Sequence, residues 1–121
     1  MRARASLKLR LSPMKILFDN GTPRPIARSL IGHEVTHARQ AGWHEMENGE
    51  LIQRAEEAGY DVLLSTDKNI RYQQNLRGRK IALVVLANSQ WPQVRLHLDR
   101  IAAAVNACTP GSYSEVAIPF D

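Results

Sequence analysis

The sequence has only one cysteine, Cys108, which excludes an internal disulfide and a structural zinc site built from cysteine pairs. A lone thiol is consistent with a reducing cytoplasm, where we expect the protein to be located. Long apolar runs are also missing. No stretch approaches the roughly 18 residues that a membrane-spanning helix needs, so no membrane partner is expected. The chain lacks a GxGxxG or P-loop motif, which argues against a nucleotide cofactor.

What is present is typical of one globular domain with a mildly basic surface. The 121 residues are 44% hydrophobic, and 16 Lys and Arg against 12 Asp and Glu give a net charge of +4. This charge is compatible with a polyanionic partner but does not require one. Residues 1–13 are basic and form either a loose arm or an extra edge strand before a domain spanning residues 14–121. No apolar core of roughly 7–15 residues follows this start, so we do not expect secretion.

Short apolar runs alternate with helical patterns along the rest of the chain. Strands are predicted at 14–18, 33–37, 62–64, 81–86 and 113–118. Helices are predicted from Thr22 to Gly32, from Asn48 to Gly59, and from Trp91 to about Thr109. Strands that alternate with helices of about ten residues indicate βαβ units. The sequence therefore predicts a three-layer α/β fold, with a mainly parallel sheet covered by helices on both faces.

Two aspartates stand directly after predicted strands, Asp19 after 14–18 and Asp67 after 62–64, and Glu50 lies in the first turn of a predicted helix. If the two strands are parallel, both aspartates emerge at the same edge of the sheet. Convergent carboxylates repel one another unless a cation lies between them. Mg²⁺ or Mn²⁺ suits such a site and can activate water for phosphodiester cleavage. The alternative is that Asp67 caps the next helix and Glu50 interacts with the helix dipole.

Other side chains near these carboxylates leave two interpretations open. Arg71 and Arg79 lie in a basic stretch beside Asp67, which either contacts a phosphate backbone or is a solvated face. His33 and His37 can share a strand face, and a polar edge strand explains them as well as a metal site does.

At this point three motifs carry a resemblance. Leu17-Phe18-Asp19, Gly49-Glu50-Leu51 and Ser65-Thr66-Asp67-Lys68-Asn69 resemble the PIN-like domain family, whose fold is Rossmann-like. The chain is most similar to its small bacterial branch, regarded as toxin-type components of toxin–antitoxin pairs. The resemblance covers residues 14–116. It implies a metal-dependent ribonuclease in which acidic residues surround Mg²⁺ or Mn²⁺.

Roles for individual residues follow from this resemblance. The implied catalytic and metal-binding residues are Asp19, Glu50 and Asp67. The implied supporting shell is Asn20, Ser65, Thr66 and Asn69, and the implied nucleic-acid contacts are Lys68, Arg71 and Arg79. The implied partners are RNA, an antitoxin protein and a second copy of the chain.

The sequence departs from the family pattern at two positions. Asn20 and Asn69 stand where related proteins often carry an acid, and each removes one negative charge from the site although its carbonyl oxygen can still coordinate a cation. Two functions follow. The first is an endoribonuclease that cleaves RNA phosphodiesters, of the toxin type. The alternative is a catalytically weak or inactive module that binds RNA or a partner protein.

Overall fold

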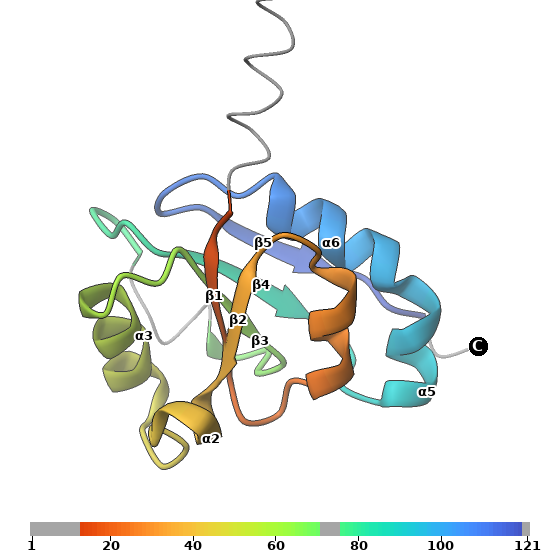
Figure 1. Ribbon diagram of the computed structural model, residues 1–121, viewed down its shortest axis with the longest axis horizontal. Coiled ribbons are helices and arrows are strands. Elements are labelled where there is room, and N and C mark those ends of the chain that lie inside the picture. Colours follow the sequence, from red (N-terminus) through yellow and green to blue (C-terminus); the bar gives the residue numbers. More distant parts are fainter. Residues whose placement is uncertain (1–12, 71–75, 120–121) are drawn as a thin grey trace, which may run out of the picture.

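The computed structural model describes residues 13–70 and 76–119. These residues form a sheet of five strands, all parallel, in the order β2-β1-β3-β4-β5 (Figure 1). The strands are β1 (Lys15–Phe18), β2 (Glu34–His37), β3 (Val62–Ser65), β4 (Ala82–Leu86) and β5 (Tyr113–Val116). The predicted α/β fold with a parallel sheet is confirmed.

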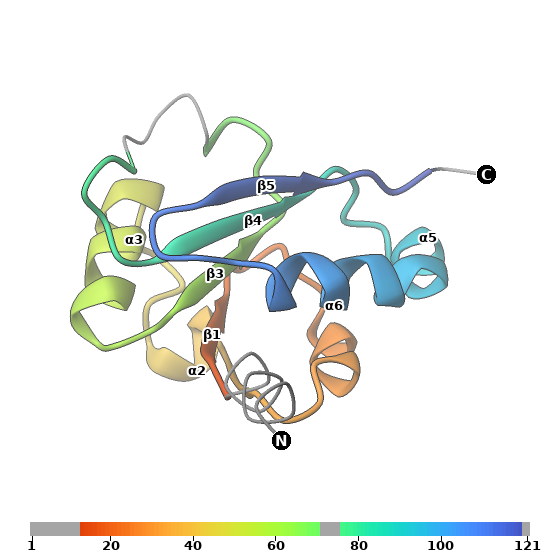
Figure 2. The same cartoon turned by 90° about the horizontal axis from the view of Figure 1, so that it is seen from above.

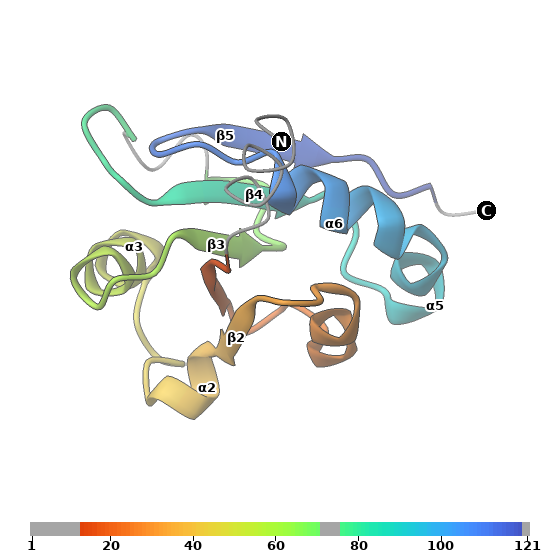
Figure 3. The same ribbon diagram turned by 45° about the horizontal axis from the view of Figure 1, so that its top comes forward.

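Helices cover both faces of the sheet. They are η1 (Arg24–Ser29), α2 (Ala38–Ala41), α3 (Asn48–Glu57), α5 (Trp91–Val94), η2 (Arg95–His97) and α6 (Leu98–Asn106). Seen from above, α2 and α3 lie on one side of the sheet and α5 and α6 on the other (Figure 2). The same arrangement of three layers is visible when the top is brought forward (Figure 3).

The apolar runs of the central strands are buried on both faces, as their sequence predicts. Successive side chains of a strand point to opposite faces. Ile16 and Phe18 accordingly belong to a core with η1 and α6, whereas Leu17 belongs to a second core with α3. Within the described residues, no helix is both long enough and apolar enough to cross a membrane.

Two predicted helices differ from the structure. The segment after β1 is a six-residue 3-10 helix, and Thr22 does not cap it. The hydroxyl of Thr22 contacts the Asp19 carboxylate instead, and Pro25, at the second helical position, has no N–H for a regular helical bond. The helix predicted from Trp91 is divided into α5, η2 and α6. The alternative of an extra strand at residues 1–13 falls almost entirely outside the described residues.

Candidate functional site

The carboxyl edge of β1 and β3 brings Asp19 and Asp67 into one pocket. Phe18 pairs with Leu64 in the parallel register, and the backbone N–H of Asp19 donates to the Leu64 carbonyl at 3.1 Å. The chain therefore leaves both strands at the same height. A pocket of about 270 Å³ opens there, and its polar lining is Asp19, Asn20, Asn48, Thr66 and Asp67.

Asp19 is held by two buried hydroxyl groups. Its side chain is only 8% exposed. Thr22 Oγ1 donates to Asp19 Oδ1 at 2.6 Å, and Ser65 Oγ donates to Asp19 Oδ2 at 2.5 Å. Both donors are neutral, so they fix the direction of the carboxylate without cancelling its charge.

Asp67 is held in a similar way by amide groups. Asn48 Nδ2 donates to Asp67 Oδ2 at 2.7 Å, and the backbone N–H of Asn69 donates to Asp67 Oδ1 at 2.9 Å. The backbone N–H of Asp67 donates to Ser65 Oγ at 3.0 Å. Ser65 therefore connects the two aspartates, because its hydroxyl donates to one side chain and accepts from the backbone of the other. Within residues 13–70 and 76–119, neither aspartate forms an ion pair.

Glu50, the third predicted carboxylate, does not line this pocket. It is exposed and lines a separate hollow on the outer side of α3, together with Gln53, Arg54 and Glu57. Among the described residues, no group of three or more His, Cys, Asp or Glu side chains is placed to hold a metal. The structure thus brings together Asp19 and Asp67 but not Glu50.

Asn48 occupies the position beside Asp67 that the sequence suggested for Glu50. The N-terminal cap position of α3 belongs to Glu47, and Asn48 is the first helical residue. Residues two apart on a helix point about 200° away from each other. Asn48 can therefore face Asp67 only if Glu50 faces outward. The signal was available, because Asn48 directly precedes the Gly49-Glu50-Leu51 motif.

The predicted supporting residues Asn20 and Thr66 both line the pocket. The amide of Asn20 donates to the backbone carbonyl of His44, a contact that a carboxylate could not make. This explains an asparagine at that position. The Thr66 hydroxyl occupies the space that a Cβ on Gly21 would need. Asn69 is exposed and contributes its backbone N–H to Asp67.

The two histidines singled out from the sequence do not meet. His33 precedes β2 and accepts from the backbone N–H of Met14 at 3.0 Å. His37 ends β2, is 6% exposed and accepts from the backbone N–H of Arg39 at 3.2 Å. Burial, and then the positive charge of Arg24, lowers the pKa of His37, so the imidazole is neutral near pH 7.

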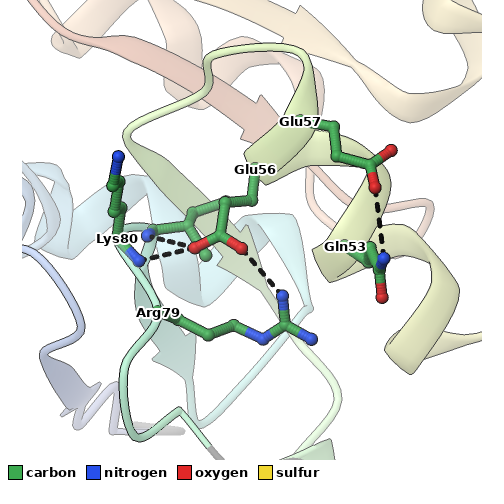
Figure 4. A network of polar contacts seen from close by, with 6 residues as sticks. Gln53, Glu56, Glu57, Arg79 and Lys80 are labelled. Carbon is green, nitrogen blue, oxygen red and sulfur yellow. Dashed lines mark hydrogen bonds and ion pairs between the residues drawn. The ribbon is translucent and has the colours of Figure 1, made fainter.

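The basic residues predicted to contact nucleic acid do not lie together. Lys68 is exposed directly after Asp67, and Arg71 lies outside the described residues. Arg79 precedes β4 at the opposite, amino edge of the sheet, where its guanidinium pairs with Glu56 at 2.9 Å (Figure 4). Proximity to Asp67 in the sequence was misleading here, because the chain crosses the sheet's length before β4 begins.

Glu56 accepts three donors in that contact. Its Oε2 accepts from the backbone N–H of Lys80 at 2.5 Å and more weakly from that of Ile81 at 3.4 Å. The bond from Lys80, followed by those from Ile81 and Arg79, lowers the pKa of Glu56. Figure 4 shows this carboxylate between Arg79 and Lys80, with Glu57 turned instead toward Gln53.

Comparison with known proteins identifies a family. The family model described as PIN like domain matches residues 14–88, from the start of β1 to the loop after β4. No curated protein and no solved structure gives a significant match. PIN-like domains are generally nucleases that bind RNA and typically depend on divalent metals. The matched residues include both pocket aspartates and most of the sheet, and the chain therefore belongs to the PIN-like domain family.

Proposed function

We propose that the chain is a metal-dependent endoribonuclease with Asp19 and Asp67 as ligands of Mg²⁺ or Mn²⁺. One observation carries the proposal. Two carboxylates line the same pocket and are held only by hydroxyl and amide donors, with no ion pair among the described residues. Two negative charges oriented in this way repel each other and attract a hard cation. Oxygen ligands of this kind fit Mg²⁺, which keeps several waters.

The chain's own residues would position the cleavage site. Ser65 and Thr22 hold Asp19, and Asn48 holds Asp67, so both carboxylates keep their direction before substrate arrives. A bound divalent ion would supply an activated water and offset the charge of the phosphodiester. We assign Lys68, which is exposed beside Asp67, a contact with a phosphate of the substrate, and we extend this role to Arg71 from the sequence.

The test is cleavage of a fluorescent single-stranded RNA with Mn²⁺, with EDTA as the metal-free control. Asp19→Asn and Asp67→Asn should each lower the rate by at least roughly 100-fold, the upper end of what losing an outer-shell metal contact costs. Glu57→Gln, on the outer side of α3, should cleave like wild type. Equal cleavage by all proteins would assign the activity to a contaminant and refute the proposal.

Glu50 has a separate test in the same assay. Its outward position on α3 predicts that Glu50→Gln retains most of the activity, whereas Asn48→Ala loses much of it because Asp67 Oδ2 loses a donor. Loss of cleavage in Glu50→Gln, with Glu57→Gln unaffected, would instead return Glu50 to the role of third carboxylate.

A second function is favoured by the low charge of the pocket. It has two carboxylates, and Asn20 is committed to the His44 carbonyl. A weak or inactive module that binds RNA or a partner protein would have the same features. Calorimetric titration distinguishes the two functions, because the module predicts no saturable Mn²⁺ binding at millimolar concentration.

We also propose a toxin-type role, supported only by the motif resemblance to small bacterial PIN-like proteins. Induced expression of wild type in a bacterial host should then arrest growth, and Asp19→Asn should not. An antitoxin protein and a second copy of the chain are the partners to seek when wild type is purified. Normal growth with wild type at the same expression level would refute the toxin-type role and leave the nuclease proposal standing.

A further inference from the structure

Two arginines follow β1 and β2 at the carboxyl edge of the sheet, the edge that also carries the aspartate pocket. The chain leaves β1 at Phe18 and reaches Arg24, the first residue of η1, and it leaves β2 at His37 and enters α2, which contains Arg39. Phe18 and His37 are paired in the parallel register of β1 and β2. Both connections therefore begin at the same edge of the sheet, where Figure 1 shows α2 directly beyond the end of β2.

The buried imidazole of His37 interacts electrostatically with both arginines. His37 is within electrostatic reach of Arg24, of Arg39 and of Asp19, which are the charged groups that act on it. The backbone of Arg39 also contacts its ring directly. The two guanidinium groups and the Asp19 carboxylate thus act on one side chain, although 15 positions separate Arg24 from Arg39 in the sequence.

Among the described residues, neither arginine forms an ion pair with a carboxylate. Both are exposed, and the ion pairs within residues 13–70 and 76–119 are His44 with Glu45 and Arg79 with Glu56. Arg79 differs from both, because its guanidinium group pairs with the Glu56 carboxylate. Two uncompensated guanidinium groups beside a pocket that carries two carboxylates are arranged for a chain of phosphates, in which one phosphate reaches the pocket and its neighbours lie on the arginines.

We infer that Arg24 and Arg39 form a phosphate-binding rim that holds the backbone of single-stranded RNA across the β2 side of the pocket. The identity of the partner rests on the proposed function. A single strand fits better than a duplex because Asp19 is 8% exposed and the pocket is about 270 Å³, so the reacting phosphate must enter a recess. Phosphates of a flexible strand can do this, whereas those of a duplex are held on the outside of a wide cylinder.

The experiment measures binding of a fluorescent single-stranded RNA by anisotropy in EDTA, over a series of salt concentrations. It compares wild type with Arg24→Gln/Arg39→Gln. The matched control is Lys80→Gln/Arg100→Gln, which also removes two positive charges, one at the amino edge of the sheet and one on α6. Arg100 donates to the carbonyl of Ala117, which follows β5. Thermal melts of all three proteins establish that each is folded.

Loss of two phosphate contacts should lower the slope of log K against log salt by about 1.4, because each contact to a single strand contributes about 0.7. The control should keep the wild-type slope. Equal slopes in the rim variant and wild type, no binding by wild type, or equal loss in the control would overturn the inference. Displacement of the RNA by poly-glutamate of the same charge as readily as by unlabelled RNA would assign the rim to an acidic protein segment and also overturn it. Arginine-dependent binding without any Mn²⁺-dependent cleavage would support the rim and refute the nuclease proposal alone.

Discussion

Glu56 at the amino edge of the sheet and the two aspartates at the carboxyl edge accept hydrogen bonds from different kinds of donor. At the amino edge, Glu56 receives a guanidinium group and backbone N–H groups, and its charge is balanced by Arg79. At the carboxyl edge, Asp19 and Asp67 receive hydroxyl and amide donors, and no basic side chain of the described residues pairs with either.

The difference separates a structural acid from a candidate functional one. A paired carboxylate joins two elements, and Glu56 joins the end of α3 to the start of β4. A carboxylate that is oriented but not paired keeps its attraction for a cation from solution. Hydrogen bonds are present in both regions, so the nature of the donor, charged or neutral, is the informative feature.

The largest effect on stability should come from Ser65→Ala. Ser65 is fully buried, and its hydroxyl serves both the Asp19 side chain and the Asp67 backbone. Its loss leaves a buried carboxylate oxygen and an N–H without a partner, which should lower the free energy of unfolding by about 2 kcal/mol. Chemical denaturation measures this value. Ser29→Ala is the control, because the Ser29 hydroxyl makes one hydrogen bond, to the Ile26 carbonyl. An equal loss of unfolding free energy in Ser29→Ala would contradict the role given to Ser65.

Glu56→Gln should cost less, about 1 kcal/mol, because the amide keeps one acceptor and loses the ion pair. The low pKa of Glu56 means that the folded state binds this proton less readily than the unfolded chain. Its contribution to stability is therefore present above the ordinary value of 4.5 and is lost as the pH falls below it. Melts from pH 7 to pH 3 should show a shallower decrease for Glu56→Gln than for Glu57→Gln. Parallel curves would contradict the role given to the Arg79 pair.

His37 should produce a pH effect at the other edge, in a higher range. Its pKa is lowered by burial and by Arg24, so the unfolded chain takes up this proton first. The contribution of neutral His37 to stability should be fully present above the ordinary histidine pKa of 6.5 and should be lost as the pH decreases below it. In EDTA, wild type should lose melting temperature between pH 7.5 and pH 5.5, and His37→Gln should lose less. Glu56→Gln, whose range lies lower, should behave like wild type over this interval.

The smallest effect concerns the two asparagines of the site. Asn69→Asp adds a charge at an exposed position next to Asp67 and should tighten Mn²⁺ binding slightly. Asn20→Asp should not, because it replaces the amide that donates to the His44 carbonyl and places two acceptors in contact. Mn²⁺ titrations of both variants test this difference. Equal tightening would show that the contact with His44 is unimportant.

The sequence predicts the sheet well and the site only in part. Runs such as Val62-Leu63-Leu64 are apolar at consecutive positions because both faces of the strand are covered, and this signal is local. The convergence of Asp19 and Asp67 follows from parallel strands. The direction of Asn48 could have been predicted as well, because it lies three and four positions before the buried Leu51 and Ile52 and so shares their face of α3. The partner of Arg79 depends on where α3 ends, so it could not be predicted from neighbouring residues.

Thermal unfolding with and without Mn²⁺ tests the central claim most directly, because a ligand that binds only the folded state raises its stability. At a metal concentration of about ten times Kd, wild type should gain roughly 1.4 kcal/mol. Asp19→Asn should lose this gain. Glu56→Gln should start from a lower melting temperature and keep the full gain, since the Glu56 carboxylate of wild type is paired with Arg79 and is not expected to bind the metal. Retention of the gain in Asp19→Asn, or its loss in Glu56→Gln, would contradict the distinction between the two edges of the sheet.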